Sequence, residues 1–472
     1  MMKQKIFKDS FWIFGIEIFL KIKAVLLIPF LTRFLGTIDY GIWSQINIII
    51  SSIYPIILLG TETAIYRFLP GKNVDEQKKS FTTWIMFLFL MSFSGAFFFY
   101  YSAEFWVKFY FGYYSNDLFK LLNLAVLNII ITVLINAIKS WYRIQNDFRI
   151  FSIVVFCQSI LNLIAVIYAL SFEKSLYYIV FYSLIADMII VGIFLVKIVR
   201  FNEWYFEFAI CKKFIKYGYV LIPSGYATWI LNSSDRIFLA QYSSLEDVGI
   251  YSLAYSLGYL AIQLFVNPIY TVFPTKASFM FNNGDIVGIL KLEGYSKRFI
   301  LLSVSASILF FLFSGKDLIK LISTEAFVSG YLIIPVITLG YLFHMLASYE
   351  LIKLGLLNKQ KYDSISTVLA CIVNLFLNFI LIPKYGMVGA AGATFFAYLI
   401  QFLIARHFYY QNWNVEIEES YADVYYAFII SMIVLYIVNR MVIINNNLII
   451  NFNIIVFIYS YFLWKLKAHC EF

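Results

Sequence analysis

Residues 151–170 read FSIVVFCQSILNLIAVIYAL, and residues 177–196 read YYIVFYSLIADMIIVGIFLV. Each run is mostly apolar and about 20 residues long, which as a helix matches the roughly 30 Å hydrocarbon core of a bilayer. A short polar connection, residues 171–176, separates the two runs. Backbone polar groups must be satisfied within the membrane, so both runs are predicted to be transmembrane helices.

The same pattern recurs along the whole chain. Hydrophobic residues make up 62% of it and charged residues 13%, about half the share of roughly 25% found in soluble domains. We predict an all-α polytopic membrane protein with both termini on one side, in which the ninth span is the shortest. The fourteen predicted spans are Phe11–Leu31, Tyr40–Gly60, Phe81–Tyr101, Leu118–Ala137, Phe151–Leu170, Tyr177–Val196, Tyr217–Ala240, Val248–Phe273, Phe299–Phe313, Gly330–Ile352, Tyr362–Ile382, Met387–Ala405, Tyr421–Val438 and Leu448–Trp464.

Positive charges give the orientation. With the N-terminus in the cytoplasm, 25 of the 36 Lys and Arg residues fall on the cytoplasmic side, 8 on the outer side and 3 inside spans. This asymmetry follows the positive-inside rule and predicts that both termini are cytoplasmic. The net charge of +9 is therefore attributed to topology and membrane lipids, and no nucleic-acid partner is expected. Four isolated cysteines and three histidines predict neither a metal site nor a cofactor.

A faint internal repeat divides the chain. A shift of 208 residues aligns Asp39-Tyr-Gly-Ile-Trp-Ser44 with Asp247-Val-Gly-Ile-Tyr-Ser252, each between an odd-numbered span and the next one. We predict two parallel-repeat six-helix bundles, residues 1–200 and 201–410, that face each other across a central cavity. Residues 411–472 add two further transmembrane helices. This is a transporter architecture.

Several segments resemble a known family. Leu27-Ile-Pro-Phe-Leu-Thr-Arg-Phe-Leu-Gly36 with Asp39-Tyr-Gly41 is similar to the opening of the polysaccharide repeat-unit flippases, which belong to the multidrug/oligosaccharidyl-lipid/polysaccharide exporter superfamily. Later segments resemble the same family in the same order: Ser234–Leu239 with Val248–Ser252, Gly355–Lys359, and Ile382–Thr394. The resemblance covers about residues 10–410. The extra helix pair resembles longer members, in which added helices border a lipid-binding groove.

The resemblance implies a carrier in the bacterial cytoplasmic membrane. Such a carrier moves an undecaprenyl-pyrophosphate-linked oligosaccharide repeat unit from the cytoplasmic to the outer leaflet by alternating access, for surface polysaccharide biosynthesis. Membrane lipids, a polysaccharide polymerase and glycosyltransferases are the further partners it implies.

A pyrophosphate is anionic and cannot cross hydrocarbon unaided, so its carrier must supply cations. Charged side chains inside spans are costly unless they face a cavity or a partner, so those present are candidates for this role. We predict substrate binding by Lys21 and Arg236, with Arg33 and Arg67 as weaker candidates. Lys21 can instead neutralise Glu17 one helical turn away. Arg236 and Arg33 can instead anchor to outer headgroups, and Arg67 can belong to a solvated helix end.

Carboxylates inside spans are candidates for ion coupling. Asp187 stands alone in the middle of the sixth span and ranks ahead of Glu17 and Asp235. A protonatable carboxylate of this kind can exchange an ion between two access states. The alternative is a hydrogen bond from Asp187 to a neighbouring helix. Asp235 and Arg236 diverge by about 100° around their helix and need not pair with each other.

Two other functional classes fit a polytopic chain. A cation-coupled multidrug exporter of the same superfamily is expected to have an acidic cavity, whereas the unpaired charges here are mainly basic. A membrane glycosyltransferase or polysaccharide polymerase needs catalytic side chains on sizeable outer loops, and the longest ones predicted here, Ser102–Asp117 and Ser314–Ser329, are short. No nucleotide-binding motif is present in the sequence. We therefore predict a transporter and not an enzyme.

Overall fold

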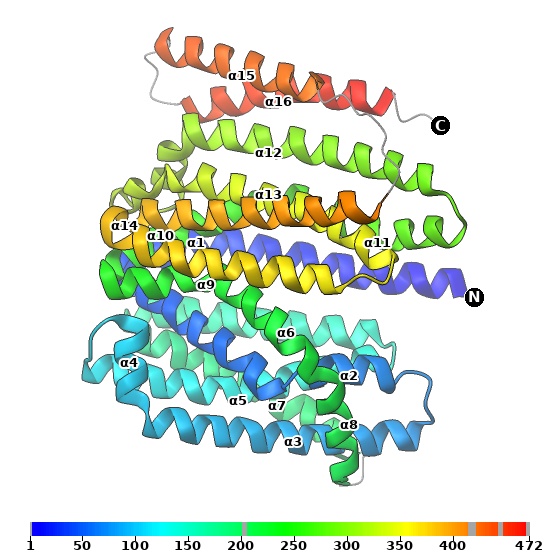
Figure 1. The fold of residues 1–472 in the computed structure, drawn as a ribbon. Coiled ribbons are helices and arrows are strands. Elements are labelled where there is room, and N and C mark those ends of the chain that lie inside the picture. The colour runs from blue at the N-terminus through cyan, green and yellow to red at the C-terminus, as the bar shows by residue number, and fades with distance from the viewer. Residues whose placement is uncertain (1, 201–204, 414–421, 442–446, 469–472) are drawn as a thin grey trace. The chain divides into compact units, whose positions relative to one another are not determined.

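The computed structural model describes residues 2–200, 205–413, 422–441 and 447–468, and its regular structure in these ranges is entirely helical (Figure 1). The predicted all-α polytopic fold is confirmed. The helices that carry the predicted spans are α1 (Met2–Leu58), α3 (Val74–Tyr101), α5 (Asn116–Ile144), α6 (Phe148–Tyr168), α7 (Leu176–Arg200), α9 (Ile222–Tyr242), α10 (Leu245–Phe265), α12 (Ile286–Ile322), α13 (Ile333–Leu356), α14 (Lys361–Asn412), α15 (Ala422–Met441) and α16 (Asn447–Ala468). Shorter helices connect them: α2 (Thr61–Phe68), α4 (Ala103–Phe111), α8 (Phe208–Gly218) and α11 (Asn267–Asn282).

Two of the long helices each contain two predicted spans. The backbone of α1 leaves helical geometry at Gly36, with φ 70° and ψ −170°. The backbone of α14 does the same at Gly386, with φ 52° and ψ −130°. Glycine adopts positive φ without the steric cost of a Cβ atom, so these positions allow a sharp break between two helical segments. With α1 and α14 counted as two segments each, the described part of every predicted span overlaps one of these long helices.

Membrane-spanning character is common among these helices. Nine helices in the described ranges are by length and composition suited to cross a membrane on their own, and Leu448–Leu463 is a shorter apolar helix. Tyr421, the predicted start of the thirteenth span, lies outside the described residues. The chain is a multi-pass membrane protein.

Some predicted boundaries were wrong. The ninth span, predicted to be the shortest, lies on α12, which is 37 residues long. Charged residues interrupt its apolar run, but the helix continues through them because several form ion pairs, including Lys297 Nζ to Glu293 at 2.5 Å. The eighth predicted span ends earlier, at Phe265, where α10 stops before Pro268 opens α11. The segment Ser102–Asp117, predicted to be an outer loop, contains the helix α4.

The chain forms two compact units, Met1–Trp229 and Ile230–Phe472. In the first unit α5 packs against α3 and α7, and α6 packs against α7 and α1. In the second unit α13 packs against α14, α10 and α12. The division predicted from the sequence at residues 200 and 410 stays a prediction. The structure divides within α9.

The last two helices belong to the second unit. Both α15 and α16 pack on α12 and on each other, as Figure 1 shows. Their shared core includes Leu309, Ala427, Leu435 and Tyr459. Polar contacts add to it, because Asn451 Nδ2 donates to Ser314 Oγ at 3.0 Å.

Candidate functional site

A polar cavity of about 470 Å³ lies inside the first unit, among α1, α5, α6 and α7. Its volume falls within the range of roughly 300–1,000 Å³ that is usual for ligand pockets. It is lined by apolar side chains and by an unusual number of polar ones for a membrane-spanning bundle. The polar and aromatic lining residues are Lys23, Trp43, Asn47, Asn128, Thr132, Lys139, Gln158, Ser159, Asn162, Ser183 and Asp187.

Asp187 is the acidic residue of this cavity, and α7 holds it there with 7% of its surface exposed. Its Oδ1 accepts hydrogen bonds from Asn162 Nδ2 at 2.6 Å and from Gln158 Nε2 at 3.1 Å, both on α6. The alternative that Asp187 hydrogen-bonds a neighbouring helix is therefore confirmed, because α6 supplies two amide donors. Its predicted role in ion coupling stays a prediction.

Two lysines line the same cavity from other helices. Lys23 comes from α1 and makes no hydrogen bond or ion pair with another described residue, while Lys139 Nζ on α5 donates to Asn136 Oδ1 at 3.4 Å. With Asp187 ionised, the three side chains give the cavity a net charge of +1. Such a cavity can hold an anionic group, and its amides and hydroxyls can bond sugar hydroxyls.

One hydroxyl of the lining is left over. Ser159 is 4% exposed, and its Oγ has no hydrogen-bond partner among the described residues. A buried polar atom without a partner is costly unless something bonds to it. Ser159 therefore points to a ligand or to water in the cavity.

The other predicted residues of the first unit lie elsewhere. Glu17, Arg33 and Arg67 are exposed, Lys21 is partly exposed, and none of these four lines the cavity. The substrate-binding roles of Lys21, Arg33 and Arg67 stay predictions.

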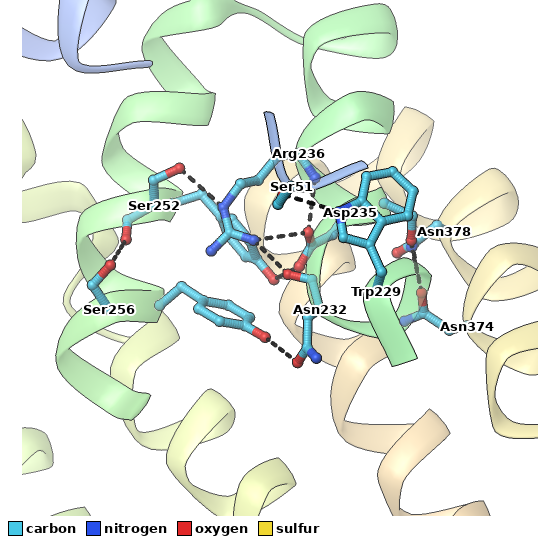
Figure 2. A network of polar contacts seen from close by, with 12 residues as sticks. Ser51, Trp229, Asn232, Asp235, Arg236, Ser252, Ser256, Asn374 and Asn378 are labelled. Atoms are coloured by element: carbon cyan, nitrogen blue, oxygen red, sulfur yellow. Dashed lines mark hydrogen bonds and ion pairs between the residues drawn. The ribbon is translucent and has the colours of Figure 1, made fainter. Parts of the chain in front are cut away.

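The second unit holds a different arrangement around Asp235 and Arg236 on α9. Arg236 Nη1 lies 3.3 Å from Asp235 Oδ1, so the expectation that the two need not pair was wrong. Both side chains are buried, and burial makes an unpaired charge so costly that the long guanidinium folds back onto its neighbour. Arg236 also donates to Ser252 Oγ at 3.1 Å and to the Asn232 carbonyl at 2.8 Å (Figure 2).

Tyrosines complete this network. Tyr251 donates to Asp235 Oδ2 at 2.5 Å, and the Tyr255 ring lies 4.2 Å from the Arg236 guanidinium carbon. Asn232 Oδ1 accepts hydrogen bonds from the hydroxyls of Tyr398 at 2.8 Å and Tyr341 at 2.9 Å. These contacts join α9, α10, α13 and α14. Arg236 is thus buried and bonded within the second unit, and its predicted substrate-binding role stays a prediction.

Amides extend the polar region from α9 toward α14. Ser234 Oγ donates to Asn374 Oδ1 at 3.0 Å. Asn378 Nδ2 donates to the same oxygen at 3.0 Å (Figure 2). The described residues contain no group of three or more His, Cys, Asp or Glu side chains that could hold a metal ion.

A four-charge cluster lies elsewhere in the second unit, between α12 and α13. Lys353 Nζ is 2.7 Å from Glu293 and 2.9 Å from Glu350, and Lys297 Nζ is 2.8 Å from Glu350. The Tyr409 ring on α14 covers Lys353 Nζ at 3.6 Å. Two cations and two anions thus neutralise one another within the bundle.

Comparison with known proteins places this chain in a family. Residues 6–280, more than half of the chain, match the family described as "Polysaccharide biosynthesis protein". The chain belongs to this family. No curated protein sequence matches at a significant level.

Solved structures share its fold. The chain is similar to the lipid II flippase MurJ in an inward closed conformation, with a TM-score of 0.79, 16% identity and coverage of 98% of this chain and 99% of that one. It is also similar to an inward-facing multidrug resistance MATE family transporter of the MOP superfamily, with a TM-score of 0.62, 13% identity and coverage of 83% and 98%. The Vibrio cholerae MATE transporter VcmN in its bent form is similar with a TM-score of 0.56 and 14% identity, and the match covers 86% of this chain and 97% of that one. At these identities the likeness establishes the fold alone, which this chain shares with these flippase and transporter structures.

Proposed function

We propose that this protein flips undecaprenyl-pyrophosphate-linked oligosaccharide repeat units from the cytoplasmic to the outer leaflet by alternating access. Membership of a polysaccharide biosynthesis family and a fold shared with a lipid II flippase support this proposal. The observation that carries it is the cavity inside the membrane-spanning helices of the first unit, which two lysines, one carboxylate and several amides and hydroxyls line. A carrier of lipids alone would not need such a lining in the hydrocarbon region.

Each part of the cavity has a proposed role. Lys23 and Lys139 attract the anionic group of the substrate, because ammonium groups in a low-dielectric site bind phosphate or carboxylate oxygens strongly. Asn and Gln amides bond sugar hydroxyls, and Trp43 offers an apolar face to a sugar ring. Asp187 exchanges the coupling ion. Lys21, Arg33 and Arg67 are proposed as weaker contacts outside the cavity.

Arg236 and Asp235 fit a different role from the one predicted for them. Their charges and hydrogen bonds are taken up by each other and by Asn232, Ser252 and Tyr251. We assign them to holding α9 against α10 and its neighbours, so that direct contact with substrate or coupling ion is a secondary proposal for this pair.

A multidrug exporter is the competing function, since MATE transporters share the fold. Cationic drugs need acidic cavities, and here two ammonium groups face one carboxylate. The charge balance therefore favours an anionic substrate over a cationic one.

Deletion of the gene tests the proposal. Surface polysaccharide should be lost while lipid-linked repeat units accumulate on the cytoplasmic leaflet, and the wild-type gene should restore export. Absence of any lipid-linked sugar in the deletion strain would point to an enzyme of assembly. Normal polysaccharide together with new drug sensitivity would point to an exporter.

Membrane orientation is part of the same proposal. Both termini and Asn358 are assigned to the cytoplasm and Ser243 to the outer side, on the distribution of Lys and Arg. Single cysteines introduced at Asn358 and Ser243 should react with impermeant reagents from opposite sides, in a variant whose native cysteines are replaced. Labelling of both positions from one side contradicts the orientation.

A further inference from the structure

His344 is an ionisable side chain inside a helix long and apolar enough to cross the membrane, α13. It is one of three histidines in the sequence, with His407 and His469. It is half-buried, whereas His407 is exposed near the end of α14. Ionisable groups at such positions are rare and usually functional.

A directed chain of hydrogen bonds starts at His344 and ends at a carboxylate. His344 Nδ1 lies 2.8 Å from Gln401 Oε1, Gln401 Nε2 donates to Thr367 Oγ1 at 3.1 Å, and Thr367 Oγ1 lies 3.5 Å from Asp363 Oδ1. An ionised carboxylate can only accept, so Thr367 donates to Asp363 and accepts from Gln401. The Gln401 carbonyl therefore faces His344, and Nδ1 must carry the hydrogen.

This chain leaves Nε2 with its lone pair free to take up a proton. Each donor in the chain points toward Asp363. The negative charge of Asp363 therefore polarises these hydrogen bonds in one direction, which favours positive charge on the imidazole. An imidazolium is the state that such a chain stabilises. The arrangement is thus suited to a histidine that gains and loses a proton.

Tyrosines connect the other side of the ring to the charged network of α9. The ring centroids of His344 and Tyr398 are 4.9 Å apart, and those of His344 and Tyr341 are 6.3 Å apart. Both tyrosine hydroxyls donate to Asn232 Oδ1, and the Asn232 carbonyl accepts from Arg236. A cation at His344 would therefore lie next to Tyr341 and Tyr398. These two tyrosines bond Asn232, and Asn232 in turn bonds Arg236.

We propose that His344 is a proton-binding site of the second unit and that its protonation controls the Asn232, Arg236 and Asp235 network. Nε2 takes a proton from water to form imidazolium while Nδ1 keeps its own, and the release step reverses this. The added positive charge acts on the rings of Tyr341 and Tyr398 and, through their hydrogen bonds to Asn232, loosens the attachment of α9 to α13 and α14. The coupling of this step to transport rests on the proposed function.

Charged and titratable groups on the neighbouring helices surround His344 and can influence its protonation. From α14, Tyr398 packs on the ring, and Asp363 is linked to it through Thr367 and Gln401. From α10, Tyr255 and Tyr259 reach it through Tyr341, with Tyr255 Oη at 2.6 Å from Tyr341 Oη. From α12, Glu293 and Lys297 are tied to Glu350 and Lys353 of α13 itself, and from α11, Tyr270 packs on Tyr349. From α9, Asp235 and Arg236 act through Asn232.

Nuclear magnetic resonance of nitrogen-15 histidine in the full-length protein measures the proton directly. A His407→Asn, His469→Asn variant leaves His344 as the single imidazole signal. We expect this signal to change from the neutral Nδ1–H tautomer to imidazolium between about pH 5 and 8, as histidine does when it serves as a switch. An imidazole that stays neutral throughout this range, or a neutral form with hydrogen on Nε2, overturns the proposal.

Asp363→Asn tests the chain without touching His344. It should lower the proton affinity of the remaining imidazole, by roughly threefold or more, because a negative charge that favours imidazolium is lost. An unchanged titration would show that Asp363 does not act on His344, which contradicts the directed chain. A shift toward higher pH contradicts it as well.

His344→Asn tests the link to transport in proteoliposomes containing lipid-linked oligosaccharide. Asn keeps a donor near the position of Nδ1 for Gln401 but cannot take up a proton. We expect the variant to flip the substrate and to lose a one-proton step in the pH dependence that the His407→Asn, His469→Asn control retains. If His344 titrates and this step persists in His344→Asn, the control of transport is wrong. If no variant or wild type moves the lipid-linked sugar, the proposed function fails while the titration still decides the proton site.

Discussion

The two units treat their buried polar groups in opposite ways. In the first unit, Lys23, Lys139 and Asp187 come from three helices and surround a cavity of about 470 Å³. In the second unit, Asp235 and Arg236 bond to each other and to their neighbours, and four further charges close on themselves between α12 and α13. In the first unit, charged groups therefore face a cavity where a ligand can bind. In the second unit, charged groups bond to one another and join helices.

The difference shows how the same residue types serve two purposes in a membrane. A buried charge that is matched by partners fixes the arrangement of its helices, and removing one partner strands the other. A charge that faces a cavity without a protein partner lowers the stability of the fold. Such a charge is expected where it binds a ligand. Changes in the second unit should therefore reduce stability first, and changes in the cavity should reduce transport first.

The largest expected effect is on Lys353, which is 1% exposed in the four-charge cluster. Lys353→Met removes the ammonium group shared by Glu293 and Glu350 and leaves two buried carboxylates with only Lys297. We expect a loss of about 3–5 kcal/mol in the free energy of unfolding. It would be measured as a lower thermal unfolding midpoint of detergent-purified protein.

Lys320→Met is the control for Lys353, because Lys320 pairs with Glu325 at 2.9 Å on the surface. This exposed pair should leave the unfolding midpoint unchanged. Equal unfolding midpoints for the two variants would contradict the prediction that the buried, mutually paired charges of this cluster stabilise the second unit more than an exposed ion pair does.

Asp187→Asn should abolish the response of transport to an ion gradient while the protein stays folded. The amide keeps the shape of the carboxyl group, and its oxygen can still accept from Gln158 and Asn162, but the negative charge is lost. Reconstituted vesicles with an imposed proton or sodium gradient measure this response. Asp117→Asn, at an exposed helix start, should respond as wild type does, and a retained response in Asp187→Asn would remove its coupling role.

Lys23→Gln and Lys139→Gln should each reduce the rate of flipping by about tenfold or more, since a charge-assisted hydrogen bond contributes about 1.5–3 kcal/mol. Arg at either position should restore part of the activity, because a charge in a wet cavity matters more than its exact geometry. Flipping of fluorescent lipid-linked sugar measures the rate. Lys21→Gln lies outside the cavity and should cost less, so an equal or larger loss there would place the anion site elsewhere.

The smallest expected effect is that of Ser159→Ala. Its hydroxyl has no partner among the described residues, so stability should not fall, while the apparent affinity for substrate should weaken a few-fold through one lost neutral hydrogen bond. Substrate titration of the flipping rate measures it. Ser92→Ala is the matched control, because Ser92 bonds the Leu88 carbonyl at 2.6 Å, and an equal change in affinity there would show that Ser159 does not contact the substrate.

Part of the cavity could have been predicted from the sequence. Asn128, Thr132 and Lys139 lie on one face of a helix by their spacing, and so do Gln158, Ser159 and Asn162. Lys139 was missed because the fourth span was predicted to end at Ala137, which assigned this lysine to a cytoplasmic loop. The helix α5 instead continues to Ile144 and carries Lys139 into the cavity.

Other features could not be predicted from local patterns. The angle between Asp235 and Arg236 around an ideal helix argued against their pairing, but burial on α9 outweighed it. The four-charge cluster joins residues that are 53 to 60 positions apart. Spacing within one helix could suggest the pairs Glu293–Lys297 and Glu350–Lys353, but not that α12 and α13 bring the two pairs together.

The sequence by itself determined that this chain crosses the membrane many times as helices, because the thickness of the hydrocarbon core and the need to pair backbone groups act on each segment separately. Only the tertiary structure decided which charges share a cavity and which neutralise one another. That choice depends on side chains from different helices, whose distances are set when the helices pack.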